Sequence, residues 1–148
     1  MGMTNRETKY WIAVAAKDHV KVGISKGIAQ ACHGKSSPLK RMKKGDYVIY
    51  YSGKLTLEKS EKCQEFTALG KVIDDEVYKC QGFENFSPSR RNIAFEPCRD
   101  IPILPLIAHL EFISNKKNWG YPFRFGFFEI NNHDFELISS KMLQHYYV

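Results

Sequence analysis

One short segment near the C-terminal end concentrates flat side chains that could stack on a nucleobase. Four aromatic residues fall within seven positions: Trp119, Tyr121, Phe123 and Phe125. Stacking of a base on an aromatic ring contributes about 1–3 kcal/mol, and Arg124 among these rings could meet a base edge or a phosphate. In an extended chain, the rings at positions 121, 123 and 125 would share one face, with Arg124 on the other. The competing interpretation is that the rings only fill a hydrophobic core.

A second segment offers hydrogen-bonding groups for the edge of a base. Gln30, His33 and Lys35 stand in an otherwise apolar stretch, where Gly34 would allow the backbone to approach a ligand closely. His33 could bond a base edge or a phosphate, and Lys35 could contact a phosphate. The competing interpretation is a structural or surface histidine. Further candidates for the walls and polar contacts of such a site are Trp11, Tyr51 and Ser52.

Positive charge favours a polyanionic partner. The formal net charge is +6, and residues 35–44 contain no acid. Lysines and arginines on one surface can neutralise phosphates, although a lysine-rich stretch can also be an ordinary solvated face. We expect a phosphate-contacting rim formed by Lys40, Arg41, Lys43, Arg90 and Arg91.

The residue pattern gives little support to catalysis. Cys32 and His33 are a potential nucleophile and base, but neighbours on a strand point to opposite faces. The sequence contains no P-loop, H-E-x-x-H motif or dinucleotide fingerprint. Its four cysteines form no C-x-x-C pair and no zinc-like spacing with histidine. The sequence therefore predicts no catalytic residues, no cofactor and no metal.

Short β-rich segments separated by turn signals indicate the elements that would position these residues. Strands are expected over residues 10–15, 28–32, 47–52, 66–78, 91–96 and 125–130. Short helices are expected over residues 18–24, 39–42 and 106–110, with an amphipathic helix over 134–145. This order predicts a mixed α/β, mainly β fold: a partly closed antiparallel β-barrel with short inserted helices and a C-terminal helix. We expect one domain over residues 1–148, with a core from about 9 to 145.

Several stretches occur together in a combination that resembles a known family. They are Tyr10-Trp11-Ile12, Gln30-Ala31-Cys32-His33-Gly34-Lys35, Gly45-Asp46 before Tyr50-Tyr51-Ser52, Ser87-Pro88 before Arg90-Arg91, and Trp119-Gly120-Tyr121-Pro122-Phe123-Arg124-Phe125-Gly126. The combination resembles the EVE-domain family of small bacterial and archaeal proteins, from about residue 10 to about residue 142. The resemblance implies the PUA-like fold shared with ASCH and YTH domains. It also implies a pocket of aromatic and polar side chains, used by some members to read modified bases such as 5-methylcytosine.

The residues and the resemblance together predict a non-catalytic binding domain that recognises a modified base of DNA or RNA through an aromatic pocket with a basic rim. Two alternatives stay open: a binding protein for a small metabolite or nucleotide, and an enzyme acting on nucleic acid or nucleotides, as in some ASCH relatives. A polar N-terminus, free thiols and the absence of long apolar runs predict a cytoplasmic protein with no membrane contact.

Overall fold

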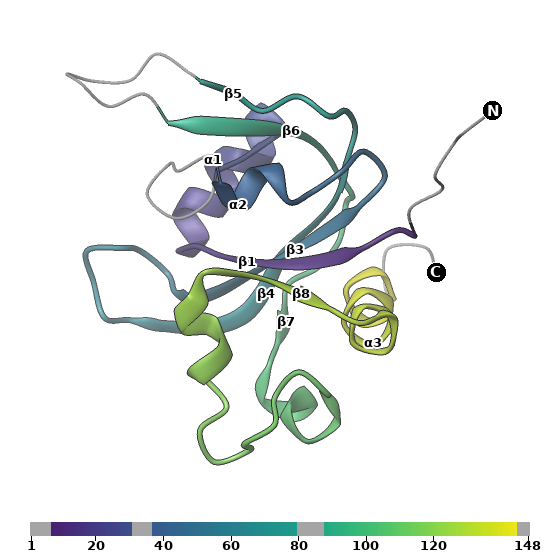
Figure 1. Cartoon of the computed structure of the whole chain (residues 1–148). Helices are drawn as coiled ribbons and strands as arrows, with labels where there is room; N and C mark the ends of the chain where they lie inside the picture. Colours follow the sequence, from purple (N-terminus) through teal and green to yellow (C-terminus); the bar gives the residue numbers. More distant parts are fainter. Residues whose placement is uncertain (1–6, 31–36, 80–87, 145–148) are drawn as a thin grey trace.

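The computed structural model describes residues 7–30, 37–79 and 88–144, and this part of the chain is built on one curled sheet. Its strands are β1 (Tyr10–Val14), β2 (Ile28–Ala29), β3 (Tyr47–Lys54), β4 (Lys62–Val72), β5 (Tyr78–Lys79), β6 (Ser89–Phe95), β7 (Ile101–Pro102) and β8 (Phe127–Ile130). Its helices are α1 (Lys17–Lys26), α2 (Ser37–Lys40) and α3 (Asn132–Leu143), with 3-10 helices η2 (Leu104–His109) and η3 (Tyr121–Phe125). Figure 1 shows the sheet curving into half a barrel.

The strands follow the order β2-β6-β4-β3-β1-β8, with β5 beside β6 and β7 beside β4. β1 and β3 run parallel, with Tyr10 opposite Tyr47 and Val14 opposite Tyr51, while the other pairs are antiparallel. A parallel pair needs a crossover connection, and α1, β2 and α2 form that connection. The predicted mainly β fold with short helices and a C-terminal helix is confirmed, with one parallel pair where a wholly antiparallel barrel was expected.

The sheet separates two hydrophobic cores, because successive side chains of a strand point to opposite faces. Tyr50 belongs to the core that also holds Trp11 and Phe127, beneath α1 and α2. Its neighbour Tyr51 belongs to the second core, with Phe123 and the buried residues of α3. Figure 1 shows α1 and α2 on one side of β1, with α3, η2 and η3 on the other. The predicted site residues are therefore divided between two faces of one sheet.

The longest predicted strand differs from the observed one at both ends, since β4 begins at Lys62. The strand expected over residues 66–78 ends at Val72, before the acidic turn that starts at Asp74. Gly70 lies within β4 and pairs in regular register with Val48 on β3 and Phe95 on β6. A Cβ at this position would lie 2.4 Å from Cγ2 of Ile93, so glycine lets β4 and β6 approach closely. The irregularity lies nearby instead, where Thr67 interrupts the pairing of β3 with β4.

The ends of the two longer helices, α1 and α3, differ from those predicted from the sequence. α1 begins after Ala16 rather than at Asp18, and Gly27 ends it in the left-handed region with φ of 68°. α3 begins after Asn131, whose side chain accepts a hydrogen bond from the Asp134 backbone N–H. Among the described residues, no helix combines the length and the apolar character needed to cross a membrane.

Candidate functional site

The predicted polar segment starts where β2 meets β6. The side-chain oxygen of Gln30 accepts a hydrogen bond of 2.6 Å from Arg90 Nε, and its backbone oxygen accepts one of 3.3 Å from the Tyr50 hydroxyl. Gln30 is thus held from two directions at the end of the sheet. His33, Gly34 and Lys35, which follow it, lie outside the described residues, so their predicted role stays a prediction.

Aromatic side chains flank a small residue on β1, and one of them contacts Gln30. Ala13 on β1 is opposite Tyr50 on β3 and opposite Phe127 on β8, and all three belong to the same core. Burial raises the pKa of the Tyr50 hydroxyl above its ordinary value, so the phenol stays protonated and donates to the Gln30 carbonyl. Ala13, Tyr50 and Phe127 belong to the same core as Leu39 and Met42, so the α2 segment packs on this side of the sheet.

Arg41 covers the ring of Trp11. The Trp11 and Phe127 rings stack with centroids 5.0 Å apart and planes 10° apart, and Arg41 Cζ lies 4.9 Å from the Trp11 centroid. Trp11 is only 2% exposed, and its Nε1 donates a 2.9 Å hydrogen bond to Asp46. Asp46 also accepts from the backbone N–H of Lys43, which fixes the turn after α2. Trp11 is therefore a core residue beneath an exposed arginine and not an open wall of a pocket.

Arg91 lies inside the fold, which corrects its predicted place on the phosphate-contacting rim. It is 1% exposed, and its Nη1 donates to the backbone oxygens of Leu39 (2.7 Å) and Met42 (2.6 Å). Nη2 donates to the backbone oxygen of Asp74. Burial lowers the pKa of the guanidinium. Arg91 fastens the α2 segment to β6 and so positions the exposed Lys40, Arg41 and Lys43.

The aromatic segment is a 3-10 helix, not a strand, so its side chains do not alternate as expected. Pro122 lies in the first turn of η3, and Gly126 ends it with φ of 76°. Phe123 points inward and stacks on Tyr51 with centroids 3.9 Å apart, while Trp119 meets the edge of Phe123. Phe123 and Tyr51 are buried core residues, and Trp119 is half-buried.

Ser52 is also buried, and its hydroxyl lies 2.8 Å from the Thr67 hydroxyl, with which it shares a hydrogen bond. Ser52, Tyr51 and Phe123 are all buried and are not accessible to a ligand in this structure.

The exposed part of the aromatic segment is Tyr121 with Phe125. These residues are 50% and 61% exposed, and their rings meet edge to face with centroids 5.6 Å apart. Arg124 Cζ lies 5.8 Å from the Tyr121 centroid. Tyr121 also lines a hollow of about 250 Å³ together with Pro122, Asn115 and Asn118. Aromatic rings, an arginine and amide groups are thus available to a ligand at this surface.

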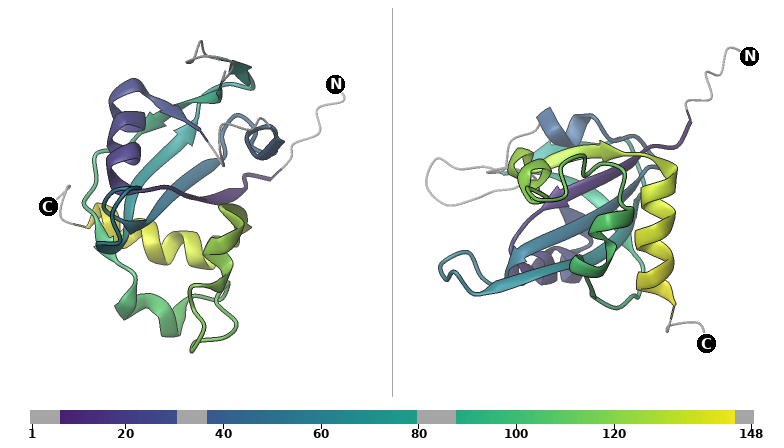
Figure 2. Two further views of the ribbon diagram at one scale, coloured as in Figure 1. Left: turned by 90° about the vertical axis from the view of Figure 1, so that its left-hand side faces the viewer. Right: turned by 90° about the horizontal axis from the view of Figure 1, so that it is seen from below.

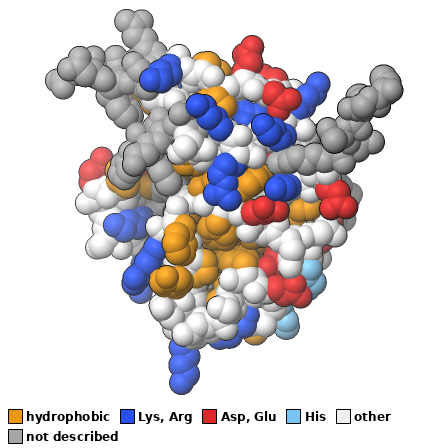
Figure 3. Space-filling view, in the orientation of Figure 1, with side chains coloured by type: hydrophobic (Ala, Val, Ile, Leu, Met, Phe, Trp, Pro, Cys, Tyr) orange, Lys and Arg blue, Asp and Glu red, His pale blue; other side chains and the backbone are white. Residues whose placement is uncertain are grey.

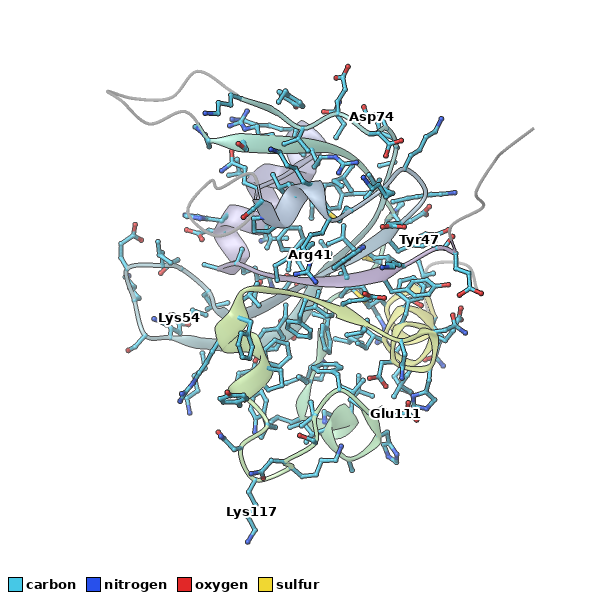
Figure 4. All side chains as sticks on the ribbon, viewed as in Figure 1. Arg41, Tyr47, Lys54, Asp74, Glu111 and Lys117 are labelled. Atoms are coloured by element: carbon cyan, nitrogen blue, oxygen red, sulfur yellow. The ribbon has the colours of Figure 1, made fainter. Side chains whose placement is uncertain are left out.

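The basic segment meets the start of β8, which directly follows the aromatic segment, on one face of the molecule. Arg41 Cζ lies 5.8 Å from the centroid of Phe127, which begins β8 two positions after Phe125. Figure 4 shows Arg41 between α2 and β8. In Figure 3, hydrophobic side chains gather at the centre of this face, with lysines and arginines around and above them. A single ligand could therefore contact both segments.

Sequence features that suggest chemistry have structural explanations where the structure describes them. Burial, followed by the hydrogen bond to Glu65, raises the pKa of the Cys63 thiol to about 11, and burial raises the pKa of Cys98. Neither of these two thiols is activated as a nucleophile. Residues 23–27 match G-x-S-x-G, but Ser25 lies inside α1 and its hydroxyl donates to the Val22 carbonyl. A nucleophile elbow requires a strand-to-helix turn instead.

One cluster has the composition of a metal site. Ligand atoms of Glu111, His133 and Asp134 lie within 4.8 Å of one another. The two carboxylate oxygens of Asp134 accept hydrogen bonds of 2.8 Å from the backbone N–H groups of Glu111 and Phe112. These bonds tie the turn after η2 to the start of α3, so the cluster has a structural role.

The family model for the EVE domain matches residues 9–141. The chain belongs to the EVE family. A UPF0310 protein of Bacillus licheniformis is 53% identical over 129 residues, which cover 87% of this chain and 88% of that protein. A UPF0310 protein of Mycolicibacterium vanbaalenii is 45% identical over 133 residues, covering 90% of this chain and 92% of the relative.

Solved structures share the fold of this EVE domain at low sequence identity. Rpa0253 from Rhodopseudomonas palustris aligns with a TM-score of 0.58 and 16% identity, covering 95% of this chain and 99% of that protein. Human THYN1, solved in complex with DNA containing 5-methylcytosine, aligns with a TM-score of 0.51 and 16% identity, covering 90% of this chain and 96% of THYN1. These likenesses place the EVE domain in the PUA-like fold class.

Sequence reasoning missed three side chains that organise this EVE domain. Tyr50 anchors Gln30, Phe127 supports Trp11 and Arg41, and Asp46 holds the α2 turn. The Gly-Asp pair before β3 was the available signal for Asp46, but such pairs occur in many turns. Alternation along β3 places the side chains of Tyr50 and Tyr51 on opposite faces of the sheet, but it does not determine which of them faces α2.

Proposed function

We propose that this EVE domain binds nucleic acid without turning it over, and that it prefers a modified base. The observation that carries the proposal is the contact of Arg41 with Phe127 at the start of β8, two residues after the aromatic segment ends. On that face, Tyr121 and Phe125 expose rings on which bases can stack. Lys40, Arg41 and Lys43 supply positive charge for phosphates. The THYN1 neighbour with its 5-methylcytosine DNA adds support at the level of the fold.

We propose that base recognition takes place at the Gln30 end of the same molecular surface, which extends past the edge strand β8 to η3. The hydrogen bonds from Arg90 and Tyr50 hold Gln30 in place, so its remaining polar group is presented at little conformational cost. His33 and Lys35, which follow Gln30 in the chain, complete this segment as predicted from the sequence. The proposed ligand therefore runs from the polar end at Gln30 to the exposed rings of η3.

The test is fluorescence anisotropy with short single- and double-stranded DNA and RNA, each with and without 5-methylcytosine, at several salt concentrations. Tyr121→Ala with Phe125→Ala should weaken binding about 5- to 150-fold if one base stacks on this pair. Arg41→Gln should reduce the slope of log affinity against log salt by about 1, as expected for one lost phosphate contact. Gln30→Ala and His33→Ala should reduce the preference for the modified base more than the total affinity.

Lys117→Gln is the matched control, because Lys117 projects away from the molecule in Figure 4 and its loss removes the same charge as Arg41→Gln. The comparison requires that each variant has the same thermal unfolding midpoint as the parent, so that weaker binding does not result from loss of folding. The proposal would be overturned by weak binding that does not depend on base modification and that Lys117→Gln reduces as much as Arg41→Gln. The next experiment would then be a thermal-shift screen of free nucleotides and metabolites.

A further inference from the structure

A second open site lies on the other side of the sheet, between α3 and the β7–η2 segment. This groove has a volume of about 550 Å³, within the range of about 300–1,000 Å³ common for small-molecule sites. α3 contributes His133, Leu137 and Lys141, which are four residues apart and therefore share one helix face. The right-hand view of Figure 2 shows η2 lying beside α3. The opposite wall consists of Ile101, Pro102, Pro105, Leu106 and His109.

The lining has an apolar floor with positive charge at its ends. Leu137 is half-buried, Ile101 and Leu106 are buried, and two prolines extend the apolar wall. Arg99 and Lys141 are the permanent cations, and none of the described residues that line the groove is acidic. Such a surface complements a molecule with an apolar body and a negative group.

The two ends of the groove differ in how well they suit an anion. His133 Nδ1 lies 2.9 Å from Asp134 Oδ1 and 3.7 Å from Glu111 Oε2, so carboxylates already neutralise this end. At the other end, Arg99 Nε donates a 3.1 Å hydrogen bond to the Lys141 carbonyl, which fixes the guanidinium beside the last turn of α3. The nine residues from His133 to Lys141 are separated by eight helical steps and span about 12 Å of helix. A negative group therefore fits the Arg99–Lys141 end, with room for an extended apolar chain along α3.

We propose that this groove binds an elongated amphipathic carboxylate, with its carboxylate against Arg99 and Lys141 and its apolar chain along Leu137, Leu106 and Ile101. Guanidinium and ammonium groups form charge-assisted hydrogen bonds with carboxylates. Burial of the chain against the leucine and isoleucine side chains removes apolar surface from water. None of the residues that line the groove belongs to the α2 segment or to η3, so the two proposed sites are separate.

Titration of the full chain with decanoate, followed through its backbone amide signals by NMR, tests this proposal. We expect saturable shifts concentrated at Leu106, Leu137 and Lys141. The double variant Arg99→Gln, Lys141→Gln should weaken decanoate binding about tenfold, since each exposed ion pair contributes a factor of about two to five. Lys141→Glu alone reverses a charge on the same exposed helix face and should weaken binding more than Lys141→Gln.

Decan-1-ol and Lys117→Gln are the matched controls. Decan-1-ol keeps the apolar chain without the charge and should bind at least tenfold more weakly than decanoate, whereas Lys117→Gln should bind decanoate like the parent. The proposal is overturned if decanoate shifts do not saturate, if the alcohol binds as tightly as the acid, or if the double variant binds decanoate unchanged. Affinity for DNA should be the same in the double variant, which separates this groove from the proposed nucleic-acid site.

Discussion

Arg91 provides the sharpest test of how this fold holds its basic surface. Its buried guanidinium donates to three backbone carbonyls, of Leu39, Met42 and Asp74. These bonds join the α2 segment and the turn after β4 to strand β6. Arg91→Met retains an unbranched apolar side chain but leaves the three carbonyls without their donor.

The expected loss of stability follows from opposing contributions. Hydrogen bonds to charged groups contribute about 1.5–3 kcal/mol each, while the cost of keeping a guanidinium out of water offsets a large part of their sum. We expect Arg91→Met to lower the free energy of unfolding by about 2–4 kcal/mol. In a chain of this size that corresponds to a fall in Tm of about 5–15 °C.

Urea unfolding followed by tryptophan fluorescence measures this loss, because Trp11 and Trp119 report on different cores. Arg90→Gln is the control, because the hydrogen bond from Arg90 to Gln30 is exposed and its loss should cost less than about 1 kcal/mol. The reasoning is refuted if Arg91→Met unfolds at the same urea concentration as the parent while its DNA binding loses about one unit of salt slope. That outcome would put Arg91 in contact with phosphate.

Three further perturbations follow from buried or paired groups. Gly70→Ala should lower the free energy of unfolding by about 1–3 kcal/mol, because the added methyl group would overlap the Ile93 side chain on β6. Urea unfolding measures this loss, and an unchanged midpoint would mean that β6 moves away without cost. Asp46→Ala should cost about 3 kcal/mol and alter Trp11 fluorescence, since the buried indole N–H loses its acceptor; a stable variant with parental fluorescence would contradict this. The hydrogen bond to Asp134 raises the pKa of His133, so this pair stabilises the fold fully below about pH 6.5 and progressively less as pH rises through the higher folded-state pKa. NMR titration should place the His133 pKa above 6.5, and a value at or below 6.5 would refute the pairing.

Local patterns in the sequence predict the elements well and their pairing poorly. The strand at Tyr47 and the helix after Asn131 follow from short-range signals, β-rich composition and an amphipathic repeat with a capping residue. The parallel pairing of β1 with β3 depends on where the crossover packs, which no local pattern encodes. The aromatic segment is not extended, because Pro122 and the flanking glycines favour a tight turn. This signal is present in the sequence, but the many aromatic residues favoured the prediction of a strand.

The candidate site shows the same limit at the level of single residues. Arg90 and Arg91 are neighbours on β6, and alternation requires one to face inward, but the sequence does not say which. The same holds for Tyr50 and Tyr51. A shift of register by one residue in either strand would exchange the roles of its two residues. Assignment of the rim therefore depends on tertiary packing: Arg91 reaches the Leu39 and Met42 carbonyls while Arg90 reaches Gln30.

The net charge of +6 also does not identify a single surface. Arg41 lies on the side of the sheet that α2 covers, and Arg99 with Lys141 lies on the side that α3 covers. If the field of the whole protein attracted nucleic acid, Arg99→Gln with Lys141→Gln would weaken DNA binding more than Arg41→Gln, because it removes two charges rather than one. If phosphates contact the Arg41 face, the single variant must have the larger effect and the double variant almost none. The comparison separates a local interface from general attraction without requiring the ligand to be known.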